Sequence, residues 1–353
     1  MHAVHASAPA KLVVAGDYAV LEGAPAVVIA LDRRAHVEVE SLADTDAAFC
    51  IDAPDLDIRG AQGRLEGERI TWSSDADRLT LVTAVLQYLA QHGAAPRSAH
   101  VTLDTQAFFA GDGAKLGLGS SAALTVALTA AVNTANDAEA GDLAAMIGMH
   151  RRMQGGRGSG LDIAAALMGG TLIYRLSDGQ AQTERARWPH ELGLCCVWSG
   201  RSASTGSALA QLADWRSRHT AAYATHMQAL SDAAAEVAVA LRAGSGADMA
   251  TGMSEYADML ARFGETVGID IVSAEHRALA AMANDCGVVY KSCGAGGGDV
   301  GMAVAVDDDR LSHFARQAAS AGFRIVETGI DERGLSVQTA NTSHRRQPWT
   351  TYA

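Results

Sequence analysis

Short apolar runs near the start of the chain predict β-strands. Three of them lie at 11–14, 27–31 and 37–39. The glycine-bounded stretch 16–23 predicts the turn or hairpin that joins two of these strands. A polar segment rich in Asp and Gly at 52–77 indicates loops and edge strands, and alternation at 100–104 predicts another strand. The chain is therefore expected to begin as a β-sheet.

Helical periodicity is clearest at 79–91 and 121–133. The first segment places its apolar side chains on one face, which predicts an amphipathic helix. The second is rich in Ala, Leu and Val and predicts a helix that is buried on nearly every side. A shorter apolar helix is expected at 163–168, ended by two glycines and followed by a strand at 171–174.

The second half of the chain alternates strands with long helical patterns. Strands are predicted at 194–198, 288–291, 302–306 and 323–327, and helices at 207–243, 245–265, 274–286 and 311–321. The segment 176–191 is polar and irregular, so we place a lobe boundary there. The sequence thus predicts an α+β protein with a first lobe at 1–190, a second lobe at 191–345 and a polar tail at 346–353.

Length and composition agree with two lobes. The chain has 353 residues, and single cores usually stop growing near ~250 to 300 residues. Its first residues carry no basic n-region, and the apolar run at 26–31 is too short to span a bilayer, so we expect a soluble, cytoplasmic protein without a membrane partner. Five cysteines without CxxC spacing fit reduced thiols.

The charge balance bears on the ligand. A net charge of −12 argues against nucleic acid as a partner, because binding to its phosphates requires a basic surface. An acidic chain can still bind a small polyanion if its few basic side chains come together at one site. Only three of the 28 basic residues are lysines, Lys11, Lys115 and Lys291, and each stands beside a glycine-rich or small-residue segment. A bias toward Arg is the bland explanation, but the two cations are not interchangeable at a reacting phosphate.

The segment Lys115-Leu-Gly-Leu-Gly-Ser-Ser-Ala-Ala directly precedes the buried helix. Its glycines let a ligand approach the backbone, and its serines stand at a helix N-terminus, where N–H groups and the dipole attract anions. We interpret it as a phosphate cradle, although it lacks the Walker A order. A dinucleotide fingerprint is a weak alternative, because the residues before it, 111–115, form a polar turn and not a strand. An ordinary capped helix is the other alternative.

A second glycine-rich segment, Lys291-Ser-Cys-Gly-Ala-Gly-Gly-Gly-Asp, lies between two predicted strands. Four glycines in five positions are costly to order unless the backbone must pack closely against something. We interpret the segment as a second wall of the same site, with an ordinary loop as the alternative. The stretch 8–23, which holds Lys11 and a glycine-bounded turn, would be unremarkable alone.

Together the three segments resemble, in order and separation, the three motifs of the GHMP kinase superfamily. This resemblance covers almost the whole chain. It implies the two-lobed GHMP kinase fold, with a first lobe like ribosomal S5 domain 2 and a ferredoxin-like second lobe, and ATP and Mg²⁺ as cofactors. The residues that it implies for ATP binding are Lys115, Gly117, Leu118, Gly119, Ser120, Ser121 and Ala122, with Ser121 as the Mg²⁺ ligand.

Two further stretches resemble one branch of that superfamily, the phosphomevalonate kinases. They are His150-Arg-Arg-Met-Gln-Gly-Gly-Arg-Gly-Ser-Gly-Leu-Asp162 and Trp198-Ser-Gly-Arg-Ser-Ala-Ser-Thr205. Mevalonate kinases usually show Pro-Ser-Gly-Val-Asp in place of the first. This chain departs from the branch at Gly156, where a basic residue is common, at Leu161, which replaces an aromatic, and at Asp17, which replaces Glu. The second metal ligand and the acceptor therefore stay open.

The resemblance implies that ATP phosphorylates (R)-5-phosphomevalonate, with Lys11 and Asp162 as catalytic residues. Lys11 would neutralise charge between donor and acceptor. Asp162 would orient the acceptor or pair with Lys11 and would act as a base only for a hydroxyl acceptor; helix N-capping is its alternative role. A phosphate acceptor is already mostly ionised at neutral pH and needs extra cations instead.

The cluster Arg151, Arg152 and Arg157, with Arg201, fits that need for cations, and a solvated helix face is its alternative. The expected substrate-binding residues are Asp17, Tyr18, His150, Arg157, Ser159, Gly160, Arg201, Ser202, Ser204, Thr205, Lys291, Gly294, Ala295, Gly296, Gly297 and Asp299. The partners expected from these residues are ATP and a small phosphorylated molecule. The oligomeric state stays open, and a homodimer is compatible with the sequence.

Other functions remain in competition. Mevalonate kinase, or another GHMP small-molecule kinase, shares every phosphate-binding feature. A non-catalytic ligand sensor on the same fold is a different class, against which the presence of Lys11, Ser121 and Asp162 argues. A nucleotide-binding dehydrogenase is the third alternative, and it requires binding of NAD(H).

Overall fold

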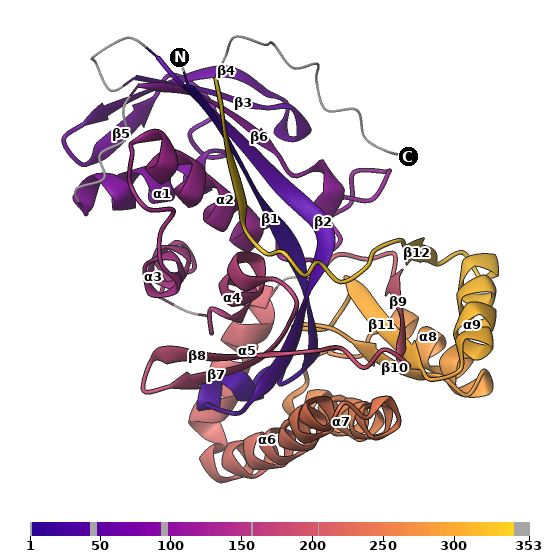
Figure 1. Ribbon diagram of the computed structural model, residues 1–353. Coiled ribbons are helices and arrows are strands. Elements are labelled where there is room, and N and C mark those ends of the chain that lie inside the picture. The colour runs from indigo at the N-terminus through magenta and orange to yellow at the C-terminus, as the bar shows by residue number, and fades with distance from the viewer. Residues whose placement is uncertain (1, 43–47, 93–97, 157, 204, 342–353) are drawn as a thin grey trace.

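The computed structural model describes residues 2–42, 48–92, 98–156, 158–203 and 205–341 of the chain. These residues form two lobes that meet along one side (Figure 1). The first lobe contains a large sheet with helices, and the second contains a small sheet with helices. The predicted α+β class is thereby confirmed.

The first lobe is built on a nine-stranded sheet in the described part of the chain. Its strand order is β13-β1-β2-β6-β3-β4-β5, and the hairpin of β7 and β8 pairs with β2. The bounds are β1 His2–Ala15, β2 Ala26–Ser41, β3 Ala48–Ala53, β4 Ile58–Glu66, β5 Arg69–Trp72, β6 Ala99–Asp104, β7 Thr171–Ser177, β8 Gln180–Ala186 and β13 Ser336–Asn341. The start of β2 is covered on both faces, which explains why its apolar run at 26–31 is continuous and not alternating.

Four helices and three short 3-10 helices accompany this sheet among the described residues. They are α1 Thr80–Gln91, α2 Ser120–Ala135, α3 Leu143–Met153, α4 Leu161–Met168, η1 Ala19–Glu22, η2 Pro54–Leu56 and η3 Gln106–Phe108. Helix α2 packs on β1 and β2 and also contacts α1, α3 and α4. Almost every side chain of α2 is buried, so the predicted all-round burial of this helix is confirmed.

The second lobe has a four-stranded antiparallel sheet with the order β10-β11-β9-β12. Its elements are β9 Gly193–Trp198, α8 Ala274–Asp285, β10 Val289–Ser292, β11 Val300–Ala305, α9 Asp308–Ser320 and β12 Arg324–Val326. In chain order they form a β-α-β-β-α-β unit, which is the ferredoxin-like arrangement. The prediction of a ferredoxin-like second lobe is therefore confirmed by the topology.

Three helices are inserted between β9 and α8: α5 Thr205–Arg218, α6 Thr220–Ala243 and α7 Gly246–Val267. Helix α7 buries Met249, Met253, Tyr256, Leu260 and Phe263, which are three or four positions apart and therefore lie on one face. This helix contacts β10, β11 and β1, and α6 contacts β2 and η1. The inserted helices thus pack on both lobes and fix one lobe against the other.

The predicted boundaries of the lobes need correction. Residues 336–341 were expected in the second lobe, but as β13 they pair antiparallel with β1 at the edge of the first sheet. Arg34 of β2 and Asp331, just before β13, form a buried ion pair that holds the C-terminal segment against the first lobe. The irregular segment 176–191 contains strand β8, whose exposed polar residues hide its period. The tail at 346–353 lies outside the described residues.

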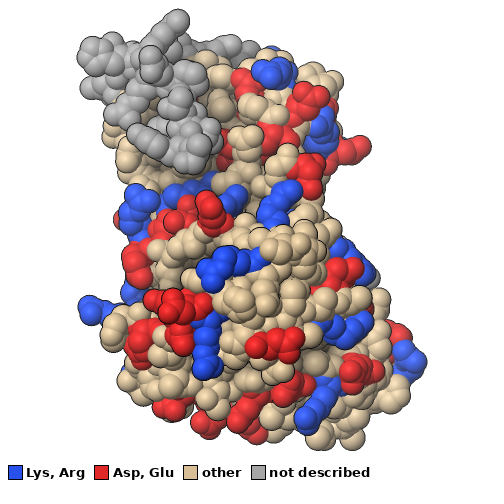
Figure 2. All heavy atoms as spheres, turned by 90° about the vertical axis from the view of Figure 1, so that its right-hand side faces the viewer, with Lys and Arg blue, Asp and Glu red and all other residues tan. Residues whose placement is uncertain are grey.

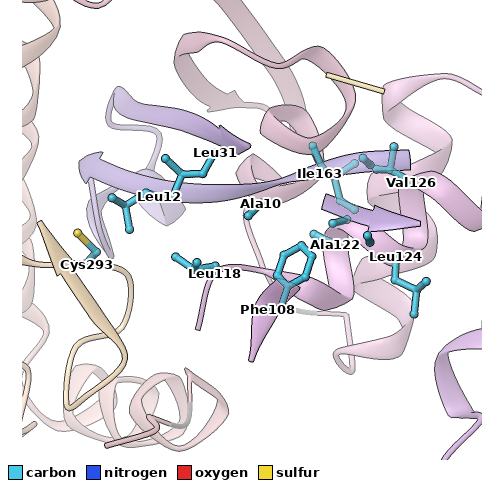
Figure 3. Packing of buried hydrophobic residues seen from close by; sticks show 14 of the residues in the cluster. Ala10, Leu12, Leu31, Phe108, Leu118, Ala122, Leu124, Val126, Ile163 and Cys293 are labelled. Atoms are coloured by element: carbon cyan, nitrogen blue, oxygen red, sulfur yellow. The ribbon is translucent and has the colours of Figure 1, made fainter. Parts of the chain in front are cut away.

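One hydrophobic core runs through both lobes. Figure 3 shows Leu12, Leu118 and Cys293 at one end of it, where β1 and the loop before α2 meet the second lobe. On the face shown in Figure 2, positive and negative side chains are interspersed. Within the described ranges, no helix has the length and apolar character needed to cross a bilayer.

Candidate active site

A cavity of about 170 Å³ lies at the junction of the lobes. Nine of the residues predicted from the sequence line it: Lys11, Asp17, Tyr18, His150, Ser159, Gly160, Asp162, Gly294 and Ala295. They come from β1, the turn after it, the end of α3, the start of α4 and the loop after β10. The fold therefore gathers parts of the first and third of the three motif segments, together with the stretch 150–162, around one space.

Lys11 and Asp162 form an ion pair on the wall of this cavity. Lys11 Nζ lies 3.7 Å from Asp162 Oδ1, and the two side chains are 12% and 32% exposed. The main-chain N–H of Lys11 donates to the carbonyl of Leu118 at 3.0 Å. This bond fixes β1 beside the loop 115–119 that precedes α2, which we call the phosphate loop. A pair this long and this accessible is easily opened by a ligand.

Asp162 stands in the first turn of α4, but it does not cap that helix. The N-cap is Gly160, with φ 89°. A side chain at this position would clash, because a Cβ would lie 2.8 Å from Ile147. The capping role considered for Asp162 is therefore not supported, and its carboxylate is available to the cavity.

The loop before α2 has the geometry of an anion site. Gly117 and Gly119 adopt φ 77° and 82°, which favour glycine. Gly119 is the N-cap of α2 and has no side chain to accept from the first-turn N–H groups, so these groups are free to bind an anion. Gly119 also packs against Lys11, because a Cβ there would lie 3.0 Å from Lys11 Cγ. The phosphate loop and Lys11 are thus immediate neighbours.

Ser121 and His150 connect this loop to the cavity. Ser121 Oγ lies 3.1 Å from His150 Nε2. Burial lowers the pKa of His150, with Asp162 opposing and Lys11 assisting the shift, so the imidazole is neutral near pH 7. Gln154, one turn further on, also borders the cavity.

The floor of the cavity joins the two lobes through Asp17 and Tyr18. Asp17 Oδ1 accepts from the N–H of Gly294 at 2.7 Å. The Tyr18 hydroxyl donates to the carbonyl of Ala295 at 2.5 Å, and burial raises the pKa of this phenol, which therefore stays protonated. Tyr18 has φ 61°, a conformation that is rare for a residue with a side chain and is held here by these contacts.

Lys291 does not reach the cavity. Its side chain is 0% exposed, and its Nζ lies 2.7 Å from Asp17 Oδ2. The structure therefore places Lys291 behind the cavity wall and does not support its predicted direct contact with substrate. Asp17, which lines the cavity, stands between this lysine and any ligand.

Gly296 and Gly297 also face away from the cavity. A Cβ on Gly296 would lie 2.3 Å from the carbonyl oxygen of Ile271, and the N–H of Gly297 donates to that oxygen at 2.9 Å. Their missing side chains allow close packing inside the second lobe, so the structure does not support direct contact of these two residues with substrate.

Asp299 and the loop 199–203 form a second group beside the phosphate loop. Asp299 Oδ1 accepts from the N–H of Ala203 at 3.0 Å. Ser202 Oγ donates to the carbonyl of Lys115 at 3.1 Å. A Cβ on Gly117 would lie 2.2 Å from the Asp299 carboxylate, so the two segments touch. Burial raises the pKa of Asp299. This group adjoins the phosphate loop and not the cavity.

Of the expected arginine cluster, the described members Arg151, Arg152 and Arg201 do not line the cavity. Arg151 donates to the carbonyls of Gly158 and Ser159, each at 2.9 Å, and so braces the loop before α4. Arg152 lies over the ring of Tyr88, on the outer side of α3. Arg201 is half exposed and faces Asp270 and Glu275. Arg157 and Ser204 lie outside the described residues, as does the side chain of Thr205.

The sequence interpretation missed several apolar walls of the cavity. They are Val13, Val20, Leu21, Leu161 and Leu209. Leu209 comes from α5, and an apolar residue on an amphipathic helix carries no local sign of such a role. Gln154 belongs to a stretch that resembled phosphomevalonate kinases, which was the available signal.

Comparison with known proteins identifies the family. Residues 80–170 match the GHMP kinases N-terminal domain. Phosphomevalonate kinase of Streptomyces sp. (strain CL190) is 30% identical over 89% of this chain and 94% of its own length. A mevalonate kinase of Methanothermobacter thermautotrophicus is 33% identical, but over 48% of this chain and 49% of its own.

Solved structures share the fold. The Lin0012 protein from Listeria innocua superposes with a TM-score of 0.83 at 22% identity, covering 96% of this chain and 99% of its own. Streptococcus pneumoniae phosphomevalonate kinase, in complex with phosphomevalonate and AMPPNP, gives a TM-score of 0.75 at 18% identity over 92% and 99% of the two chains. The chain is a phosphotransferase that belongs to the GHMP kinase family and is similar over most of its length to phosphomevalonate kinase.

Proposed function

We propose that this enzyme transfers the γ-phosphoryl group of ATP to (R)-5-phosphomevalonate, forming 5-diphosphomevalonate in the mevalonate route to isoprenoids. The observation that carries the proposal is the position of Lys11 and Asp162 on one small cavity, directly beside the phosphate loop. The acceptor is proposed from the near full-length similarity to a phosphomevalonate kinase.

The phosphate loop would hold the triphosphate of ATP. Its glycines let a ligand approach the backbone, and the N–H groups at the start of α2, which Gly119 leaves without a side-chain cap, would bind the anion. Lys115 is exposed at the entrance of this loop and adds a positive charge. Donors that the loop backbone holds in place would supply the preorganisation that phosphoryl transfer requires.

The residues present also fit Mg²⁺. Ser121 would supply one ligand, because a hydroxyl that donates its proton to the neutral His150 ring keeps a lone pair for the ion. In the described ranges, no group of three or more His, Cys, Asp or Glu side chains forms a metal cage. That fits an ion that keeps water and takes phosphate oxygens as its other ligands. Bound there, Mg²⁺ would neutralise charge on the phosphates.

Lys11 and Asp162 would act on the reacting groups. When the phosphates enter, Lys11 can leave its loose contact with Asp162 and neutralise the oxygens that approach each other. Asp162 would position the acceptor, because an ionised phosphate has no proton that a strong base must remove. The transfer is in line, with a loose transition state in which positioning and cations lower the barrier.

Mevalonate is the second candidate acceptor. The same Asp162 carboxylate could accept the proton of a hydroxyl, and mevalonate kinases are similar over about half of this chain.

All five cysteines are free thiols, which supports a reducing, cytoplasmic location for either activity.

Product analysis tests the proposal. The enzyme would be incubated with ATP, Mg²⁺ and phosphomevalonate and followed by ³¹P NMR. We expect the phosphomonoester signal to be replaced by the two coupled signals of a diphosphate, with ADP formed in equal amount. ADP formation without that diphosphate, or no turnover, would refute the proposed acceptor.

A further inference from the structure

Lys291 and Asp17 form an ion pair that is fully buried between the lobes. Both side chains are 0% exposed, and Nζ and Oδ2 are 2.7 Å apart. Nζ also donates to the carbonyl of Ser292 at 2.7 Å and lies 5.7 Å from the ring centre of Tyr256. Because apolar side chains often replace such a pair without loss of stability, stability alone does not explain its presence.

The partners of Asp17 connect this pair to the active site. Its second oxygen, Oδ1, accepts from the N–H of Gly294 at 2.7 Å, and its main-chain carbonyl accepts from the Tyr256 hydroxyl at 2.8 Å. Asp17 and Gly294 both line the cavity, as does Lys11. A Cβ on Gly294 would lie 3.9 Å from Lys11 Nζ, so the Asp17–Gly294 contact is next to the Lys11 ammonium.

Two lysine–aspartate pairs therefore meet at this junction, Lys291 with Asp17 and Lys11 with Asp162. Which lysine pairs with which aspartate decides whether Lys11 is available to a ligand. Lys291 is bound to Asp17 at 2.7 Å without exposure to solvent. Lys11 is 3.7 Å from Asp162 and partly exposed. The buried Asp17 carboxylate thus has a cation of its own, whereas the ion pair of the cavity lysine with Asp162 is long. Exchange of these partners would leave Lys11 less able to bind a phosphate.

We propose that Lys291 is a positioning residue that keeps Asp17 neutralised and bound to the second lobe, so that the Lys11 ammonium stays available to the transferred phosphoryl group. Lys291 acts through Asp17 and Gly294 and touches neither ATP nor acceptor. Without its charge, the buried Asp17 carboxylate would attract Lys11, the other lysine of the junction. The proposal rests on phosphoryl transfer with the participation of Lys11 and not on the identity of the acceptor.

Three variants test this partition of charge: Lys291→Met, Asp17→Asn and the double variant. For Lys291→Met we expect a loss in kcat of roughly tenfold or more, with the KM for ATP changed by less than about threefold. Since the double variant removes both charges, and the amide oxygen that replaces Asp17 Oδ1 can still accept from Gly294, it should recover at least about fivefold over Lys291→Met. A double variant no better than Lys291→Met, or a Lys291→Met variant with normal kcat, would overturn the proposal.

A second buried pair provides the matched control. Arg34 and Asp331 are also buried, at 8% and 1% exposure, but neither lines the cavity. Arg34→Met removes a buried cation in the same way and should lower the urea midpoint while kcat stays within about twofold of the wild type. Equal losses of kcat in Arg34→Met and Lys291→Met would show that the effect is general destabilisation.

A measurement on the wild type covers the case in which Lys291→Met does not fold. Because the chain has only three lysines, ¹³Cε-lysine labelling gives three signals, which Lys11→Met and Lys115→Met assign. On addition of AMPPNP and Mg²⁺ we expect the Lys11 signal to shift and the Lys291 signal to stay in place. A larger shift at Lys291 than at Lys11 would indicate direct contact and overturn the proposal. This experiment needs no acceptor, so failure to convert phosphomevalonate would refute the proposed function alone.

Discussion

Ser121 Oγ and His150 Nε2 lie 3.1 Å apart, and this contact joins the phosphate loop to the cavity at the junction of the lobes. Ser121 stands in the first turn of α2, and His150 stands in the last turn of α3. Since burial lowers the pKa of His150, the neutral ring can accept the hydroxyl proton and fix the direction of the oxygen lone pairs. The orientation of a proposed metal ligand is thus set by a residue of the cavity wall.

Replacing His150 by Leu should lower kcat by roughly tenfold, because one buried hydrogen bond contributes about 1 to 1.5 kcal/mol. The Mg²⁺ concentration for half-maximal activity should rise as well, since Ser121 Oγ loses its fixed direction. Steady-state kinetics over a Mg²⁺ titration measures both effects. His313→Leu, at an exposed position of α9, is the control. An unchanged Mg²⁺ requirement would contradict the role given to His150.

Replacing Lys11 by Met should lower turnover by roughly a hundredfold or more, because the cation beside the reacting phosphates is lost. The urea midpoint should change little, since the Lys11–Asp162 pair is long and partly exposed. A coupled ADP assay measures turnover, and Arg218→Met, which removes an exposed cation on α5, should keep normal activity. Near-normal turnover of Lys11→Met would exclude its catalytic role.

Replacing Asp162 by Asn should also lower turnover by roughly a hundredfold, while the fold is kept because Asp162 does not cap α4. If the carboxylate positions a phosphate acceptor, the remaining activity should show the same dependence on pH as the wild type. A pH–rate profile distinguishes this from general base catalysis, in which a limb of the profile would disappear with the carboxylate. Asp285→Asn, at the exposed end of α8, is the matched control.

Stability should fall in mild acid through His276. This side chain is fully buried behind the glycine-rich loop, with Nε2 2.8 Å from the Gly298 carbonyl and Nδ1 2.8 Å from the Tyr290 hydroxyl. The carbonyl can only accept, so Nε2 carries the proton and Nδ1 accepts from Tyr290. Burial, as the largest effect, lowers the pKa of His276, so the unfolded chain binds this proton first. Its contribution to stability is complete above about pH 6.5 and is lost as the pH falls toward the lowered pKa.

Urea unfolding at pH 7.5 and pH 5.5 measures this effect. The wild type should be less stable at the lower pH, and His276→Gln should show a smaller difference between the two values, although it is less stable at both. His276 is not the only histidine that can contribute, because His36 and His150 also have lowered pKa values. The informative quantity is therefore the change in pH dependence on mutation. An unchanged dependence in His276→Gln would show that this histidine is not the source of the effect.

The sequence was sufficient for those parts of the site that depend on local pattern. The phosphate loop precedes an apolar helix, so both were predictable from glycine content and periodicity around 117–133. The strands and most helices of the second lobe follow apolar runs and were placed within a few residues. The helix expected at 207–243 is instead two helices, α5 and α6, which meet at His219. The order of strands that makes this lobe ferredoxin-like was available only from the family resemblance.

Other parts depend on contacts that no local pattern encodes. Lys291 stands beside a glycine-rich loop, like Lys115, but its partner Asp17 is distant in the chain, so its burial could not be read locally. Arg151 stands in a basic cluster, yet two neighbouring carbonyls bind it. Strand β13 is polar and is defined by its pairing with β1. In each case a long-range or tertiary contact decides the role of the residue.

The acceptor proposed for this enzyme is a phosphate and not a hydroxyl. The most direct test compares kcat/KM for (R)-5-phosphomevalonate and (R)-mevalonate with the same enzyme, ATP and Mg²⁺. We predict a preference of roughly a hundredfold or more for phosphomevalonate, because specificity arises from the difference in transition-state binding. Equal values, or a preference for mevalonate, would contradict a phosphate acceptor.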